Sequence, residues 1–196
     1  ISEQFKRTFS IGKPFGEVGF PKVGMQTSNN YKYLRFWFEI KGDEFLNQST
    51  TAPKWIKYLK GGSFRRWYGN LINVLNYENN GMELKKFKGY QKSDESFYFK
   101  QGITYSDVST GLFGMRYLPE GTISDACGPM LASCYKNSYK YAIAFSNSNV
   151  FQEYINFLCP GMHNNWGSIA EIPVIINGTE VERIEKGTYR FNASKV

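Results

Sequence analysis

The segment from Lys54 to Asn70 combines the side chains that proteins use to bind a polyanion. It reads KWIKYLKGGSFRRWYGN, in which three lysines and two arginines are interleaved with aromatic residues and no acid interrupts them. Lysine neutralises phosphates without reading sequence, and arginine can pair bidentately with guanine in the major groove. Gly61-Gly62 would let the backbone turn or approach a phosphate closely. This pattern favours nucleic-acid binding over the alternative of a buried strand pair with solvated lysines.

The overall charge agrees with an anionic partner. The 196-residue chain has 24 Lys and Arg against 17 Asp and Glu, which gives a formal net charge of +7, and its pI is about 9.2. A basic balance of this size favours nucleic acid as a partner. Many basic domains bind nothing anionic, so the charge supports the motif and does not replace it.

Side chains for catalysis are few. The chain has a single histidine, His163, and no H-E-x-x-H, G-x-S-x-G, Walker or dinucleotide-binding pattern. An enzyme built on His163, Glu78 or Asp125 is the least favoured alternative, because nothing in the sequence supplies these groups with a partner. The three cysteines have no C-x-x-C spacing, which predicts reduced, mostly buried thiols without a zinc site.

The segments around the motif predict a sheet-rich domain of mixed α/β class. An aromatic fraction of 17% together with 19 glycines favours pleated strands joined by tight turns. Strands are expected at 33–40, within 96–109 and at 114–126. In the last of these, Pro119-Glu120-Gly121 is expected to connect a hairpin.

One helix is predicted near the C-terminal end. SNSNVFQEYINFLCPG (146–161) begins with capping serines, continues with an apolar stripe at helical spacing, and stops at Pro160-Gly161. One face of this helix is expected to pack on the sheet. The apolar run YKYAIAF (139–145) is expected to be a buried strand that leads into it.

The chain predicts one unit over residues 14–176, with extensions at 1–13 and 177–196. It has no internal repeat, low-complexity tract or Pro/Ser-rich linker. We expect no membrane and a cytoplasmic location, since the chain has no charged-then-apolar leader and no apolar run near 18 residues. The missing initiator Met leads us to expect a fragment of a longer protein.

Several ordered blocks resemble the adenine-specific DNA methyltransferases of BREX phage-defence systems, the PglX family. The motif at 54–70 followed by NVLNYENNG (73–81) resembles a signature in the C-terminal half of that family. VGMQTSNNYKYLRFWFEI (23–40) is similar to its G-x-x-T-G-x-N block, although Ser28 stands where the family usually has glycine. QGITYSDVSTGLFGMRYLPEGTISDACGPML (101–131) resembles a third block, which starts with a G-I-T-[WY]-S run.

A broader likeness links the chain to target-recognition domains. Residues 139–175 look like the strand, Asn-Ser helix start and I-x-x-I-P closing block of such domains in type I specificity subunits and in fused restriction-modification methylases. The resemblance covers roughly residues 14–176. It implies a target-recognition-domain-like α/β (α+β) fold, with a twisted, mostly antiparallel sheet and a few packed helices.

The resemblance implies that this fragment recognises a sequence in double-stranded DNA for an adenine-specific methyltransferase. Methyl transfer from S-adenosylmethionine would take place in a catalytic domain elsewhere in the parent chain, because the Asn/Asp-Pro-Pro-Tyr/Phe motif is absent here. No catalytic, cofactor-binding or metal-binding residue is assigned to the fragment. Together with the basic motif, the resemblance assigns DNA contacts to three loops: Gly24, Gln26, Thr27, Asn29 and Asn30; Lys57, Lys60, Gly61, Gly62, Arg65, Arg66, Tyr68 and Asn70; and Thr104, Tyr105 and Ser106.

A protein-docking module is the alternative from another functional class. In that interpretation the aromatic and basic loops bind other subunits of a defence complex. Salt dependence separates the two, because phosphate contacts release counterions and weaken steeply as salt rises.

Overall fold

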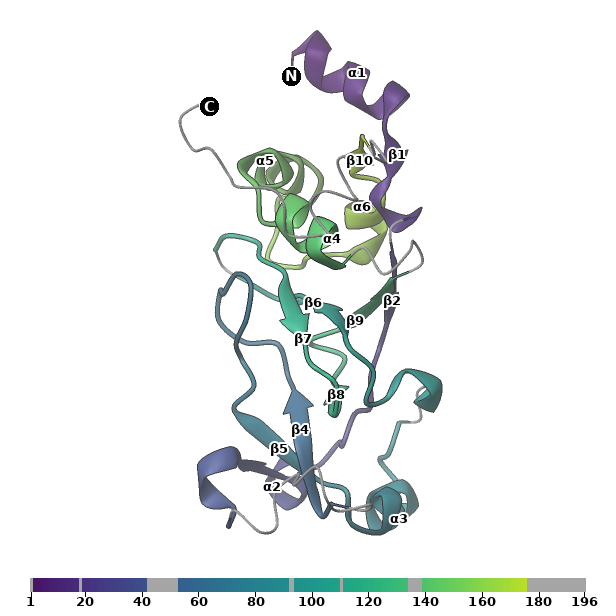
Figure 1. Ribbon diagram of the computed structural model, residues 1–196, viewed down its shortest axis with the longest axis vertical. Helices are drawn as coiled ribbons and strands as arrows, with labels where there is room; N and C mark the ends of the chain where they lie inside the picture. The colour runs from purple at the N-terminus through teal and green to yellow at the C-terminus, as the bar shows by residue number, and fades with distance from the viewer. Residues whose placement is uncertain are drawn as a thin grey trace.

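The computed structural model describes residues 2–17, 19–41, 53–91, 94–109, 111–133 and 139–175. Two small sheets lie one above the other along the long axis of the molecule, and most of the helices gather at the upper end (Figure 1). This mixed architecture confirms the expected α/β (α+β) class. The predicted C-terminal extension at 177–196 lies outside the described residues.

The upper sheet has the strand order β2-β9-β6-β7, and each neighbouring pair is antiparallel. Its strands are β2 (Gly19–Lys22), β6 (Gly102–Thr104), β7 (Arg116–Leu118) and β9 (Met130–Ser133). The strand expected within 96–109 is therefore present as β6. A separate ribbon pairs β1 (Lys13–Pro14) with β10 (Pro173–Val174) beside the helices.

The lower sheet has the order β3-β5-β4-β8, in which β4 and β8 run parallel and the other pairs are antiparallel. The strand expected at 33–40 is shorter than predicted, because a 3-10 turn (Trp37–Glu39) follows Phe36. The elements of this layer are α2 (Asn30–Tyr33), β3 (Leu34–Phe36), β4 (Trp55–Leu59), β5 (Asn73–Asn76), α3 (Glu78–Lys86) and β8 (Thr122–Ser124).

The predicted hairpin at 114–126 is wrong, although both of its strands exist. β7 and β8 belong to different sheets, so the turn at Pro119–Gly121 carries the chain from the upper sheet to the lower one. The Gly121 N–H donates to the Phe99 carbonyl at 2.9 Å, and the Phe99 N–H donates to the Thr122 carbonyl at 3.1 Å. These bonds, together with the parallel pairing of β8 on β4, take the place of a hairpin ladder.

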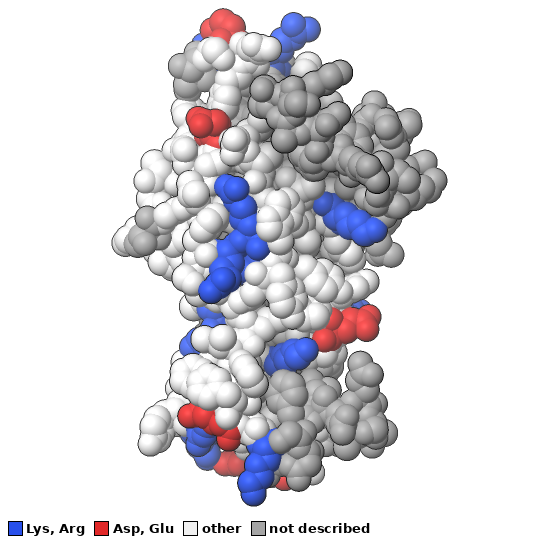
Figure 2. Space-filling view, turned by 60° about the vertical axis from the view of Figure 1, so that its left-hand side comes forward, with Lys and Arg blue, Asp and Glu red and all other residues white. Residues whose placement is uncertain are grey.

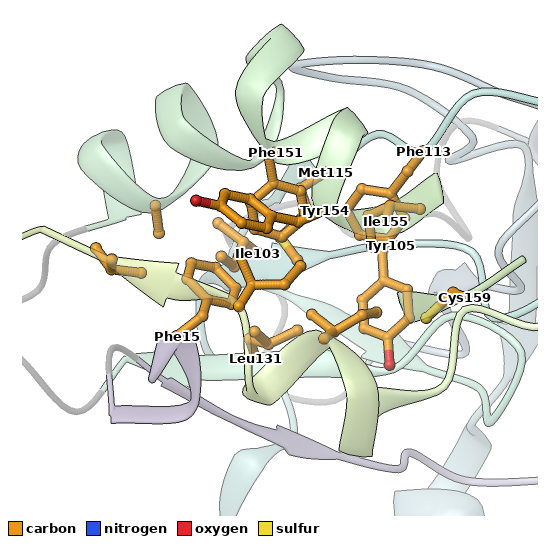
Figure 3. Close-up of a cluster of buried hydrophobic side chains, with 14 residues drawn as sticks. Phe15, Ile103, Tyr105, Phe113, Met115, Leu131, Phe151, Tyr154, Ile155 and Cys159 are labelled. Atoms are coloured by element: carbon orange, nitrogen blue, oxygen red, sulfur yellow. The ribbon is translucent and has the colours of Figure 1, made fainter. Parts of the chain in front are cut away.

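The helix expected within 146–161 is confirmed as α5 (Asn149–Leu158). Ser148 is its N-cap, because the Ser148 Oγ accepts a hydrogen bond from the Phe151 N–H at 3.2 Å. The apolar stripe is buried at Phe151, Tyr154 and Ile155. In Figure 3 these side chains contribute to the core between the helices and the upper sheet, which also contains Ile103 and Leu131 of the sheet.

Residues 139–145 form a helix and not the buried strand that the sequence predicted. This helix is α4 (Tyr139–Ser146), and its buried residues Ala142 and Ser146 lie four positions apart, which places them on one side. Periodicity alone does not separate a short buried strand from a short helix in an apolar run of this length. Two further helices complete the upper layer: α1 (Glu3–Ile11) and α6 (Trp166–Ala170).

Asn147, between α4 and α5, fastens the helices to the segment that precedes β7. Its Oδ1 accepts a hydrogen bond from the Met115 N–H at 3.0 Å, and its Nδ2 donates to the Met115 carbonyl at 2.9 Å. Both residues are buried. The amide therefore satisfies two backbone groups that have no access to water.

We predict that Asn147→Ala lowers the free energy of unfolding by about 1–3 kcal/mol, because it leaves buried backbone groups of Met115 without this partner. Urea unfolding followed by far-UV circular dichroism measures the change. Asn149→Ala is the matched control, since Asn149 is exposed at the start of α5, and its effect should stay within about 0.5 kcal/mol. Equal losses in the two variants would contradict the role of the Asn147 amide.

Candidate nucleic-acid interface

The basic motif divides at its two glycines into a buried strand and an exposed loop. Trp55 and Tyr58 point into the core from β4, whereas Phe64, Trp67 and Tyr68 are exposed on the β4–β5 loop, residues 60–72. The alternative interpretation of this motif as a buried strand therefore holds for its first part only. The second part presents aromatic and basic side chains to solvent.

Gly61 and Gly62 make the change of direction possible. Their φ angles of +77° and +118° lie in the region that favours glycine. A Cβ on Gly61 would lie 2.4 Å from the carbonyl oxygen of Cys127, so the chain turns tightly against its neighbour. These two glycines serve the turn, and a bound phosphate is not needed to explain them.

The backbone of the loop is fixed to β7. The Trp67 N–H donates to the Met115 carbonyl at 3.1 Å, and the Tyr117 N–H donates to the Trp67 carbonyl at 2.8 Å, so that Trp67 pairs with Arg116 as in a parallel strand. Lower in the loop, Asn70 Nδ2 donates to the Ser63 carbonyl at 2.9 Å. The loop is thus held at its tip and at its base.

Arg116 supports the loop from inside. Its side chain is 1% exposed, and it donates from Nη2 to the Ser106 Oγ at 3.2 Å and from Nη1 to the Arg65 carbonyl at 3.5 Å. The Ser106 Oγ in turn donates to the Gly62 carbonyl at 2.8 Å. Burial lowers the pKa of the Arg116 guanidinium to about 10, so it still carries its proton at neutral pH. Among the described residues, no carboxylate forms an ion pair with it.

The exposed side of the loop is basic. Arg65 is exposed, and the Arg66 guanidinium lies 5.5 Å from the centre of the Phe64 ring, within cation–π range. Figure 2 brings the left-hand side of Figure 1 forward and shows Lys and Arg side chains in the middle of this face, with acidic side chains toward its two ends and its right-hand edge. The arrangement can contact phosphates and flat apolar surfaces together.

The other predicted residues of the second loop have different surroundings. Lys57 on β4 is half-buried, and Lys60 is half-buried with its Nζ 3.8 Å from Asp125 Oδ2. Asp125 is buried and also accepts a hydrogen bond from the Cys127 N–H. This carboxylate therefore has structural partners. Between Gly62 and Tyr68 the residues of this loop are exposed, except for Arg66, which is half-buried.

The third predicted loop is inside the protein. Thr104, Tyr105 and Ser106 are all buried, and the Tyr105 ring stacks on Trp166 with 6.4 Å between centroids. Burial raises the pKa of the Tyr105 hydroxyl, so this phenol stays neutral at physiological pH. Of the three, Ser106 contacts the β4–β5 loop, because its hydroxyl forms hydrogen bonds with the Gly62 carbonyl and with Arg116.

The first predicted loop lies beside residues 87–91. Thr27 is buried and donates to Asn30 Oδ1 at 2.6 Å, and Asn29 caps α2 by accepting from the Lys32 N–H at 3.1 Å. Gly24 faces β8, where a Cβ would overlap the Ser124 carbonyl oxygen. Gln26 forms an isolated antiparallel β-bridge with Gln91. The structure joins the second and third loops through Ser106, and it joins the first loop to α2 and to the segment after α3.

Ser28 has a backbone conformation that glycine usually adopts. It stands where the resembling family usually has glycine, and its φ angle is +51°. This is the left-handed region, which glycine adopts at little cost and which few other residues adopt. The backbone here therefore keeps the conformation that a glycine would favour.

Two of the side chains that the sequence analysis considered for catalysis, His163 and Glu78, are exposed in the structure. His163 is exposed, with Nδ1 3.6 Å from Asp107 Oδ2, and Glu78 is exposed at the start of α3. In the described part of the chain, no group of three or more His, Cys, Asp or Glu side chains is placed to hold a metal ion. Likewise, none of the described helices is both long and apolar enough to span a bilayer.

Sequence reasoning missed two residues of the candidate interface: buried Arg116, which supports the loop, and exposed Trp67. Arginine is rarely buried, so Arg116 in GMRYLP was expected only as part of a strand. Its place between apolar neighbours was the available signal. Trp67 was noted as an aromatic residue of the motif, and no pattern indicated that its side chain would be exposed.

The chain is similar in sequence to parts of two methyltransferases. No protein-family model matches the chain. Adenine-specific methyltransferase PglX of Lacticaseibacillus casei (strain Zhang) is 32% identical over 165 residues, which cover 78% of this chain and 14% of the relative. Adenine-specific methyltransferase BrxX of Escherichia coli O9:H4 (strain HS) is 34% identical over 158 residues, covering 79% and 13%. The chain spans about one seventh of the length of these relatives.

We predict that Gly114→Ala displaces the β4–β5 loop, because the new Cβ would lie 2.8 Å from the Arg65 carbonyl oxygen and 3.0 Å from the Phe64 ring. The expected loss in the free energy of unfolding is about 1–3 kcal/mol, as for other overpacked sites. Gly111→Ala is the matched control in the same segment, since a Cβ there has no neighbour within 4 Å. Urea unfolding measures both, and a loss as large in Gly111→Ala would contradict the packing argument.

Proposed function

We propose that this chain recognises duplex DNA for an adenine-specific DNA methyltransferase. The observation that carries the proposal is the β4–β5 loop, where exposed Arg65, half-buried Arg66 and exposed aromatic side chains lie on a backbone fixed to β7. The similarity to parts of two adenine-specific methyltransferases supports the link to such an enzyme. In this proposal the chain selects the DNA site, and another domain of the parent protein transfers the methyl group.

The division of labour follows from the chemistry of the reaction. A methyltransferase must extrude the target adenine from the duplex to reach its exocyclic amine. A recognition domain can hold the flanking duplex through phosphates, which fix register, and through base edges, which specify sequence. Arg65 and Arg66 have the donors for both tasks, and Asn70 and Tyr68 stand close to them in the chain.

S-adenosylmethionine would bind in the separate catalytic domain. The chain has no Pro-Pro dipeptide and therefore no Asn/Asp-Pro-Pro-Tyr/Phe motif. Gly24, Gly61 and Gly114 face protein backbone at close range, so these glycines do not frame a cofactor cradle. These three glycines thus do not fit this cofactor, and no step assigned to this chain depends on it.

The setting of the enzyme is part of the proposal. The resemblance of the sequence blocks to PglX methyltransferases favours a phage-defence system of BREX type, in which other subunits can take part. An enzyme that modifies chromosomal DNA acts where the DNA is, so a cytoplasmic location is proposed.

Protein docking is a second candidate because of a separate exposed aromatic patch. Phe36, Trp37 and Phe38 are exposed near the end of β3, and the Phe36 and Phe38 rings stack with 5.3 Å between centroids. An exposed apolar cluster of this kind suits a protein partner. Binding there would depend little on salt, whereas DNA binding weakens steeply as salt rises.

A selection from a randomised duplex pool tests the proposed function. The 196-residue chain is expected to retain duplexes at low salt, and a short motif is expected to be enriched and to persist at moderate salt. Retention without enrichment would remove sequence recognition from the proposal. No retention at low salt would remove DNA binding.

We predict that Arg65→Ala weakens binding to a retained duplex. The expected loss is about 1–3 kcal/mol if Arg65 reads a base, and the slope of log K against log salt should fall by about 1 if it contacts a phosphate. Arg7→Ala in α1 makes the same change in net charge on an exposed residue far along the chain, and it should leave affinity nearly unchanged. Titration at several salt concentrations measures both, and equal losses would mean that net charge alone drives binding.

A further inference from the structure

Trp67 occupies a backbone conformation that its side chain does not favour. Its φ angle is +71°, and the Tyr68 N–H donates to the Arg66 carbonyl at 2.8 Å, which closes a three-residue γ-turn around Trp67. A γ-turn with positive φ at its centre is rare and strained, the more so with a bulky residue there. The side chain is 53% exposed, so burial in the core does not account for this arrangement.

The strained turn is held by the rest of the fold. Both backbone groups of Trp67 bond to the chain around β7, one to Met115 and the other to Tyr117. The Arg65 carbonyl, two residues earlier, accepts a hydrogen bond from buried Arg116. The turn is therefore fixed before any partner arrives, and little conformational freedom would be lost when its tip binds. Strained residues of this kind concentrate at functional sites.

The neighbours of Trp67 define the partner. Phe64 and Tyr68 are exposed beside it, Arg65 and Arg66 precede it, and no acid occurs from Lys54 to Asn70. A partner that fits must carry negative charge next to flat apolar faces. Stacked base pairs between two phosphate backbones have this combination, whereas an acidic peptide offers the charge without the stack.

We infer that Trp67 is a wedge that inserts between two base pairs of the bound duplex, while Arg65 and Arg66 contact the phosphates on either side. This inference rests on the proposed function, because it assumes that the loop meets DNA. Insertion unstacks one base step, and pyrimidine–purine steps unstack most easily. The wedge would therefore add sequence preference at one step without a hydrogen bond to any base.

The experiment uses duplexes retained by the chain in the selection, with 2-aminopurine placed at successive positions, since this base fluoresces more strongly when unstacked. With saturating chain, fluorescence is expected to rise several-fold at one step. Trp67→Gly should abolish the rise, and it should still fold because glycine adopts the positive φ freely. Trp67→Phe should keep most of the rise, because the ring remains an apolar wedge. Trp37→Ala is the matched control, since Trp37 is 55% exposed on the separate aromatic patch, and it should leave the rise unchanged.

Each outcome decides between this inference and the function on which it rests. Binding without a rise at any position, or an unchanged rise with Trp67→Gly, would overturn the wedge and leave DNA recognition in place. A rise lost equally in Trp37→Ala would also overturn it. No binding by the unaltered chain at low salt would remove the proposed function itself, and the wedge with it.

Discussion

A buried positive charge is the constraint on which the conformation of the β4–β5 loop depends. Arg116 is almost fully enclosed, and a buried charge is costly unless hydrogen bonds satisfy it. Two of its contacts are the Ser106 hydroxyl and the Arg65 carbonyl, and both belong to segments that shape the β4–β5 loop. Displacing the loop would remove partners from the guanidinium. The cost of leaving this charge unsatisfied therefore favours the loop conformation seen in the structure.

The same hydrogen-bonded system connects the helical end of the molecule to the interface. The Met115 carbonyl accepts from Asn147 Nδ2 and from the Trp67 N–H. Asn147 lies between α4 and α5, so the position of the loop tip is tied to the packing of these helices against the upper sheet. The packing of the helical layer thus helps to fix the position of the loop tip. A change in how the helices pack would reach the loop tip through one carbonyl.

The sequence predicted elements with strong local signals and failed where distant contacts decide. The capping serine Ser148 and the apolar stripe after it were sufficient to predict the helix α5. The run at 139–145 was mistaken for a strand because both structures bury a short apolar segment, and the hairpin at 114–126 failed because β8 pairs with β4. In the candidate interface, the basic and acid-free composition of residues 54–70 was sufficient to predict Arg65 and Arg66. The position of Arg116 depends on contacts about ten and fifty residues away in the chain, which no local pattern contains.

The aromatic residues of the motif show how a sheet limits what a sequence pattern can mean. β4 ends at Leu59, and until that point the strand directs Trp55 and Tyr58 into the core. After β4 the chain leaves the sheet until β5, and within residues 60–72, all of which the structure describes, the one β-bridge is that of Trp67 with Arg116. Exposing large aromatic side chains forgoes the free energy of burying them, and the turn at Trp67 adds backbone strain. Neither cost improves the folded chain by itself, and under the proposed function the contact with DNA would offset both.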